Sequence, residues 1–193
     1  MLKRLYHWTL SLAAHPKAPA CLGGIAFIES SVFPIPPDVM LLPMCLSQPR
    51  KALFYALVCT LASVAGAVFG YLIGAAFFET IGEPVLALYG YQDKFADFQR
   101  IFNEQGWLWV AIFGLTFLPF KVITIASGVA GLSFPPFLLA CIASRGIRFF
   151  LVAGLLRAFG TPISVFIEKY FNYAVSAFTF LLVGGFVAVS LWH

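Results

Sequence analysis

Residues 28–39 read IESSVFPIPPDV, and this stretch decides what kind of fold the chain can adopt. Two acids bracket three prolines within it: Glu29, Asp38, Pro34, Pro36 and Pro37. Each proline removes a backbone donor and clashes with the preceding helical turn. In lipid, a backbone group freed in this way must be satisfied by protein or by water. We therefore expect the break to turn inside the protein or at a water-filled cavity, away from the acyl chains.

The composition around this stretch is that of a membrane protein. Of the 193 residues, 61% are hydrophobic and only 10% are charged, whereas soluble domains carry about 25% charged residues. The length suits a single integral membrane domain, here residues 1–193, and leaves room for only about four to six spans. The net charge of +4 indicates how the chain is oriented in the membrane and that it contacts anionic lipid headgroups. We expect no nucleic-acid partner.

Charge is distributed unevenly along the chain. Basic residues without acids occur near the N-terminus and at Arg50–Lys51, whereas residues 79–106 carry five acids against two bases. Short loops rich in lysine and arginine stay in the cytoplasm. The sequence therefore predicts a cytoplasmic N-terminus and places the polar middle segment on the opposite side.

Three segments are long and apolar enough to cross a bilayer: residues 52–78, 137–159 and 170–192. The first contains Gly66, Gly70 and Gly74 at every fourth position. Small residues at this spacing allow another helix to approach closely, so we expect these glycines to form a packing face. Between the first two spans, residues 79–106 have aromatic side chains at helical spacing, which predicts an amphipathic helix at the interface.

Two further apolar regions, residues 18–48 and 107–134, are interrupted near their middle. The second interruption reads LPFK and contains Pro119. Each flanking arm is too short for a hydrocarbon core about 30 Å thick. This pattern predicts two re-entrant hairpins, each followed by a long helix and entering from opposite faces, as in the inverted repeats of transporters. The predicted fold class is thus an all-α polytopic membrane protein with two inverted re-entrant helical hairpins, an interfacial helix between them and an extra C-terminal span.

Five ionisable residues fall within the apolar regions: Glu29, Asp38, Lys121, Arg145 and Arg148. A charge at the centre of a span costs about 2.5–3.5 kcal/mol on insertion scales, so these residues must be paired or hydrated. One interpretation is a polar cavity at the midplane, in which Glu29 carries a proton and the bases Lys121, Arg145 and Arg148 hold an anionic phosphate. The alternative is a set of closed ion pairs that lock the hairpins together.

Signals for an enzyme are missing from the sequence. It contains no HExxH or GxSxG motif and no phosphatase-like arrangement of His and Asp. Its four cysteines lie in apolar runs without a CxxC pair. We expect no catalytic residues, no cofactor and no metal site.

Three motifs occur in a recognisable order. They are Glu29 followed by PIPPD (34–38), GYLIG (70–74), and a break with Pro and Lys running into ASGVAGLSF (126–134). Together they resemble the DedA family, also called the SNARE-associated or VTT-domain family, over about residues 20–160. The stretch LPFKVITIASG (118–128) is most similar to its YqaA branch.

The resemblance implies a protein of the bacterial inner membrane with two opposed hairpins, in which the family's essential acids match Glu29 and Asp38. The second hairpin of the family usually carries two arginines around the proline. In this chain Thr116 stands at the first of these positions, and Lys121 stands one place before the second. This departure leaves open whether the substrate differs.

The function implied by the resemblance is movement of a lipid or polyprenyl-phosphate carrier between leaflets, in the manner of a flippase or scramblase. Protons drive the process in some members, and the activity supports envelope homeostasis. The expected partners are membrane lipids, an anionic lipid phosphate and protons. Two alternatives stay open, a small-ion or proton antiporter and a non-transporting membrane-integrity or assembly factor. The sequence leaves the coupling ion, the direction, the oligomeric state and the side of the C-terminus open.

Overall fold

The structure, a computed structural model, describes residues 17–31, 36–116 and 119–160, and the regular structure in these ranges is helical throughout. In chain order the elements are α2 (Ala18–Ser31), α3 (Asp38–Ser47), the 3-10 turn η1 (Pro49–Lys51), α4 (Ala52–Phe77), the π-helical turn η2 (Phe78–Gly82), α5 (Glu83–Tyr89), α6 (Gln92–Leu115), α7 (Phe120–Val129) and α8 (Phe134–Phe159). The prediction of an all-α chain is confirmed for this part of the protein. The predicted span over 170–192 and Pro34 lie outside the described residues.

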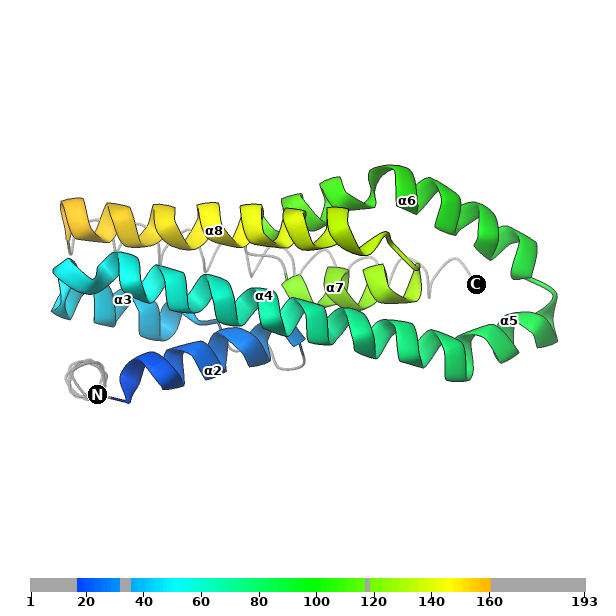
Figure 1. Cartoon of the computed structure of the whole chain (residues 1–193), viewed down its shortest axis with the longest axis horizontal. Coiled ribbons are helices and arrows are strands. Elements are labelled where there is room, and N and C mark those ends of the chain that lie inside the picture. The colour runs from blue at the N-terminus through cyan, green and yellow to red at the C-terminus, as the bar shows by residue number, and fades with distance from the viewer. Residues whose placement is uncertain (1–16, 32–35, 117–118, 161–193) are drawn as a thin grey trace, which may run out of the picture.

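Two long antiparallel helices, α4 and α8, form the centre of the molecule (Figure 1). The continuous helical run Pro49–Tyr89 has 41 residues and Phe134–Phe159 has 26, and both are long and apolar enough to cross a membrane. The start of α8 is favoured by prolines in its first turn, where their missing N–H groups cost nothing. Its end lies at Gly160, whose φ of +64° suits glycine.

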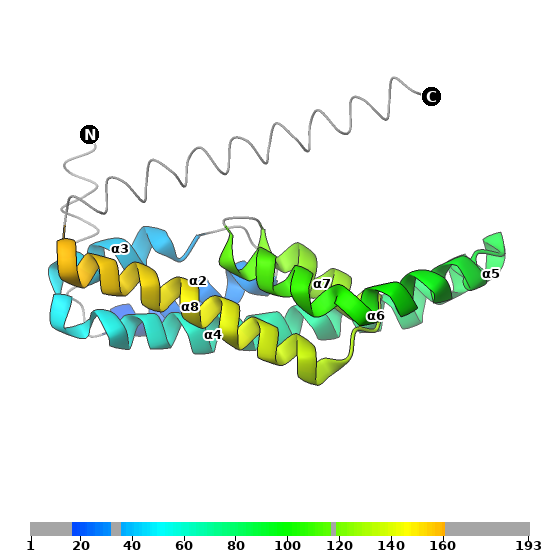
Figure 2. The same cartoon turned by 90° about the horizontal axis from the view of Figure 1, so that it is seen from above.

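The remaining helices form two broken pairs, which we call the first broken pair (α2 and α3) and the second broken pair (α6 and α7). Helix α4 packs against α2 of the first broken pair and α7 of the second. Helix α8 packs against α6 of the second broken pair, and α3 lies against both α8 and α4. The helix ends on either side of the two breaks consequently come near one another at mid-length along the molecule (Figures 1 and 2).

The structure differs from the sequence prediction at residues 79–106, which do not form one separate helix. Elements η2 and α5 continue the direction of α4 as far as Tyr89, and Gly90 then reverses the chain with a φ of +67°. Helix α6 runs without interruption from Gln92 to Leu115 and so joins the amphipathic part to the predicted first arm of the second hairpin. The physical reason is that Gln92–Leu115 contains no proline, and Gly106 alone does not end a helix.

Two apolar clusters stabilise the packing, and they flank the middle of α4 and α8. One cluster joins α2, α3, the start of α4 and the end of α8 around Leu22, Met44 and Phe149. The other joins α6, α7 and the start of α8 around Phe120 and Phe137. Between them, at mid-length, lies the polar region in which the predicted charges meet.

Candidate functional site

Four charged side chains are buried where the two broken pairs approach α8. Glu29 lies in the last turn of α2 and is 9% exposed, and Asp38 is the first residue of α3 and is 4% exposed. Arg145 and Arg148 lie one turn apart on α8, at 0% and 8% exposure. The N-terminus of α3 favours the negative charge of Asp38, whereas the C-terminal turn of α2 disfavours that of Glu29. Glu29 therefore depends more strongly on a cationic partner.

Arg145 pairs with Glu29 through its Nη2 atom and the carboxylate Oε2 atom. The Ser30 hydroxyl lies 3.2 Å from both of these atoms and 2.6 Å from the Ser63 hydroxyl of α4. Because a hydroxyl has one proton, donation from Ser30 to Glu29 requires Ser63 to donate to Ser30. The Arg145 guanidinium also lies 4.1 Å from the centre of the Phe120 ring, a distance that favours cation–π attraction.

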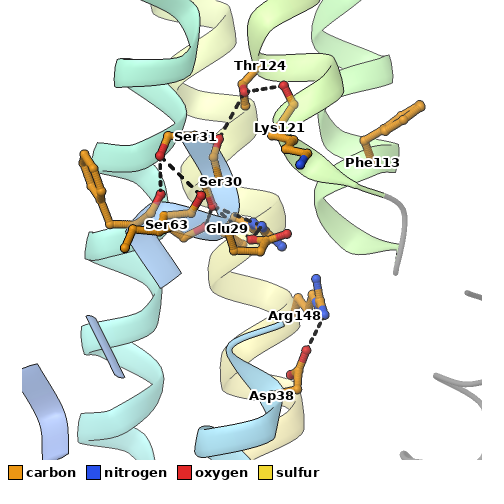
Figure 3. Close-up of polar contacts among 12 residues, drawn as sticks. Glu29, Ser30, Ser31, Asp38, Ser63, Phe113, Lys121, Thr124 and Arg148 are labelled. Carbon is orange, nitrogen blue, oxygen red and sulfur yellow. Dashed lines mark hydrogen bonds and ion pairs between the residues drawn. The ribbon is translucent and has the colours of Figure 1, made fainter. Parts of the chain in front are cut away.

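Arg148 links the two breaks. Its Nη2 atom lies 2.6 Å from Oδ2 of Asp38, at the start of α3 (Figure 3). Its Nη1 atom donates to the Thr116 carbonyl oxygen, just after the end of α6, at 3.4 Å. One guanidinium thus contacts the first break through a carboxylate and the second through a backbone carbonyl.

A second polar contact joins the broken pairs directly. The Thr124 hydroxyl on α7 lies 3.2 Å from the carbonyl oxygen of Ser30, near the end of α2, and 2.9 Å from that of Lys121. The last carbonyls of a helix have no partner within the helix. The single proton of this hydroxyl is therefore shared between the Ser30 carbonyl and that of Lys121, in its own helix. Gly70 of α4 provides the space, because a Cβ there would lie 2.6 Å from the Thr124 hydroxyl oxygen.

The predicted glycine face of α4 lies against both broken pairs. A Cβ at Gly66 would overlap the backbone of Phe27 in α2, and one at Gly74 would overlap the backbone of Ile125 in α7. Gly128 lies on the α7 side of the same contact, and a Cβ there would overlap the α4 backbone. Side chains larger than hydrogen would separate the helices whose ends form the site.

The remaining predicted residues lie at the edges of the breaks. Lys121 is half-buried in the first turn of α7, and Figure 3 shows its amino group directed toward the region of Glu29 and Arg148. Pro37 is buried next to α3, Pro36 is half-buried beside it, and Pro119 directly precedes α7. All three prolines thus stand where a helix begins, a position that tolerates the missing N–H.

Sequence reasoning missed Ser63, which contacts the Ser30 hydroxyl, and Phe120, whose ring lies against the Arg145 guanidinium. Ser63 ends the tripeptide LAS (61–63), which recurs as IAS (142–144) ahead of Arg145. This repeat indicated equivalent positions but carried no information on which side chains meet. Within the described residues, no group of three or more His, Cys, Asp or Glu side chains is placed to hold a metal ion.

Comparison with known proteins decides the family. The family model described as the VTT domain matches residues 31–158, about two thirds of the chain. The chain belongs to the VTT-domain family. The predicted DedA relationship is therefore confirmed, and with it membership of a family of membrane proteins that is commonly linked to transport. The VTT domain match includes Asp38, Arg145 and Arg148, whereas Glu29 lies two positions before its start.

Two bacterial relatives share most of their length with this VTT-domain protein. A protein of Haemophilus influenzae (strain Rd) is 39% identical over 152 residues, which is 78% of each chain. A protein of Histophilus somni is 38% identical over 152 residues, again 78% of each chain. Both are described as uncharacterized. No solved structure matches the chain.

Proposed function

We propose that this VTT-domain protein moves a lipid or a polyprenyl-phosphate carrier between the leaflets of the bacterial inner membrane, with Glu29 as a proton carrier. The observation that carries the proposal is the pair of buried ion pairs, Glu29 with Arg145 and Asp38 with Arg148, at the meeting point of two broken helices. Isolated buried charges are costly. If these ion pairs were purely structural, apolar side chains could replace them without loss of stability. We therefore infer that the charges allow a polar group to pass through the membrane.

The depth of these charges supports a site near the bilayer midplane. Arg145 lies 11 positions after Phe134, or about 17 Å along α8 at 1.5 Å per residue. Ser63 lies 11 positions after Ala52 on the antiparallel α4, also about 17 Å from the start of its helix. Half of a hydrocarbon core is about 15 Å. A polar headgroup at this site would thus be at its most costly point of crossing.

The arrangement of the broken pairs supports re-entry from opposite faces. Helices α2 and α3 have 14 and 10 residues, or about 21 and 15 Å, and each therefore reaches only part of the way through a bilayer. In Figure 1 they lie toward one end of the molecule, and α6 and α7 lie toward the other. The basic turn at Arg50–Lys51 supports a cytoplasmic side for the first pair under the positive-inside rule.

A second candidate function is favoured by one observation. Both acids are already paired with arginines, which is the arrangement expected if the charges only lock α2 and α3 onto α8. In a protein with a non-transporting role in membrane integrity, neutralising one acid would lower stability and abundance without abolishing any flux. The two candidates therefore predict different results for the same variant.

The test is leaflet exchange of fluorescent phospholipid and of polyprenyl phosphate in proteoliposomes, with and without a pH gradient. We expect wild type to exchange at least one of these lipids and Glu29→Gln to lose that exchange. Glu104→Gln removes an exposed carboxylate of α6 and serves as the matched control, with exchange unchanged. Equal reconstitution of the three proteins is checked first. Absence of exchange of both lipids in wild type would overturn the proposal, and equal exchange in Glu29→Gln would remove Glu29 from the path.

A further inference from the structure

The ion pairs of Arg145 and Arg148 each use only part of the guanidinium. Each carboxylate uses one oxygen and each guanidinium uses its Nη2 atom in the ion pair. Nε and Nη1 of Arg145, a side chain with no exposed surface, have no hydrogen-bond partner among the described residues, and neither does Oδ1 of Asp38. Buried polar atoms are normally hydrogen-bonded, so three unpaired atoms in one place need an explanation.

The ring contacts of Arg145 do not supply one. Phe120 and Phe149 attract the positive charge, at 4.1 and 5.5 Å from the guanidinium carbon. An aromatic ring has no oxygen to accept the N–H bonds that point along the plane of the guanidinium. The rings therefore hold the arginine in place while leaving the donors of its fork available for a better acceptor.

A phosphate group fits this set of donors better than the two carboxylates do. Arginine binds phosphate through two parallel N–H bonds, and a phosphate monoester presents three terminal oxygens. Side chains three positions apart on a helix have Cβ atoms about 5–6 Å apart. One phosphate can therefore reach the forks of both Arg145 and Arg148.

The two acids are also stabilised by groups other than the arginines. Glu29 accepts a hydrogen bond from Ser30, and Asp38 lies in the first turn of α3, where the helix dipole favours an anion. Loss of an arginine would therefore not leave either carboxylate without a favourable contact. Arg148 meanwhile reaches the second break through Thr116, so an anion on α8 lies between both breaks.

We propose that Arg145 and Arg148 form a clamp for a phosphate group, and that Glu29 and Asp38 are its competitors, each holding one arginine until phosphate replaces it. The inference rests on the proposed function and deepens it, because it assigns the substrate headgroup to two residues of α8. It also gives the closed ion pairs a role, that of keeping the site neutral and closed between transport events.

The experiment measures binding to the purified full-length chain in detergent. The probes are geranyl phosphate, inorganic phosphate and geraniol, which separate a lipid headgroup from free phosphate and from the apolar tail. We expect wild type to bind geranyl phosphate and not geraniol. Binding of inorganic phosphate as well would support the clamp and show that the headgroup suffices. Equal binding of geraniol, or no binding of either phosphate, would overturn the clamp.

Two substitutions test the clamp and the competition separately. Arg148→Lys keeps the charge but loses the fork, and we expect geranyl phosphate to bind about tenfold more weakly. Arg157→Lys, an exposed position on the same helix, is the matched control and should bind as wild type does. Asp38→Asn removes the competitor, and we expect binding to tighten by roughly tenfold. Weaker binding in a folded Asp38→Asn variant would overturn the competition.

Two measurements keep the result interpretable. Thermal unfolding and gel filtration check each variant, and Glu29→Gln repeats the competition test at Arg145 if Asp38→Asn does not fold. The clamp and the transport function fail separately. If wild type and the variants bind geranyl phosphate as expected but wild type shows no leaflet exchange, transport is overturned and the clamp stands. Leaflet exchange together with unchanged binding in Arg148→Lys would overturn the clamp and leave transport.

Discussion

Replacing Gly66 by alanine tests the close packing of α2 on α4, on which the position of Glu29 depends. A Cβ at Gly66 would lie 3.0 Å from both the carbonyl carbon and the Cα atom of Phe27, and closer still to its carbonyl oxygen. These are backbone atoms, which cannot rotate aside as a side chain can. The added methyl group therefore forces the two helices apart along their contact.

The magnitude follows from two opposing contributions. Extra methyl groups in a well-packed contact cost about 1–3 kcal/mol. Alanine is preferred to glycine within a helix by roughly 0.5–1 kcal/mol, which offsets part of this cost. We expect the free energy of unfolding of Gly66→Ala to fall by about 1–2 kcal/mol relative to wild type.

The assay is unfolding in mixed micelles by titration with a denaturing detergent, followed by circular dichroism. Gly154→Ala in α8 is the matched control, because a Cβ there meets nothing within 4 Å. The control should be as stable as wild type or more stable by about 0.5–1 kcal/mol. Equal stability of Gly66→Ala and Gly154→Ala would refute the close approach of α2 to α4.

Three smaller substitutions give further checks of the fold by the same unfolding assay. Tyr71→Phe removes the 2.7 Å hydrogen bond from the tyrosine hydroxyl to the Leu132 carbonyl oxygen and should lower stability by about 1 kcal/mol; an unchanged value would argue against this contact. Ser63→Ala removes the hydroxyl 2.6 Å from that of Ser30 and should cost a similar ~1 kcal/mol, with a larger loss of leaflet exchange if the hydroxyl orients Glu29. Gly90→Ala at the tip between α5 and α6 places a side chain at a φ of +67° and should cost about 1 kcal/mol, whereas no cost would mean that the turn adopts another conformation.

The division of the chain into helices was largely readable from the sequence, because prolines and long uncharged runs act locally. The predicted breaks at Pro37 and Pro119 directly precede α3 and α7. The long helices predicted from residues 52 and 137 correspond to α4 and α8. The division of the middle segment was predicted wrongly. Polar residues are tolerated within a helix, so α6 continues from Gln92 to Leu115, and the chain reverses at Gly90.

The buried charges were likewise readable as a set, since an apolar chain must pair or hydrate them. Which acid pairs with which base could not be read from the sequence. Glu29 and Arg145 are 116 positions apart, and Asp38 and Arg148 are 110 apart. No spacing rule connects residues at such separations, and the role considered for Lys121 as a partner of the acids was equally consistent with the sequence.

The sequence thus predicts local events: where helices stop, which stretches are apolar, and which charges must be satisfied away from water. Only the folded chain shows that α8 runs antiparallel to α4 and contacts α3 and α6, which places Arg145 and Arg148 where the two broken pairs meet. The physical reason is that proline and charge act on their own turn of helix. The pairing of distant charges depends instead on how closely helices pack, here through Gly66, Gly70 and Gly74, and packing is a property of surfaces that only the folded chain brings together.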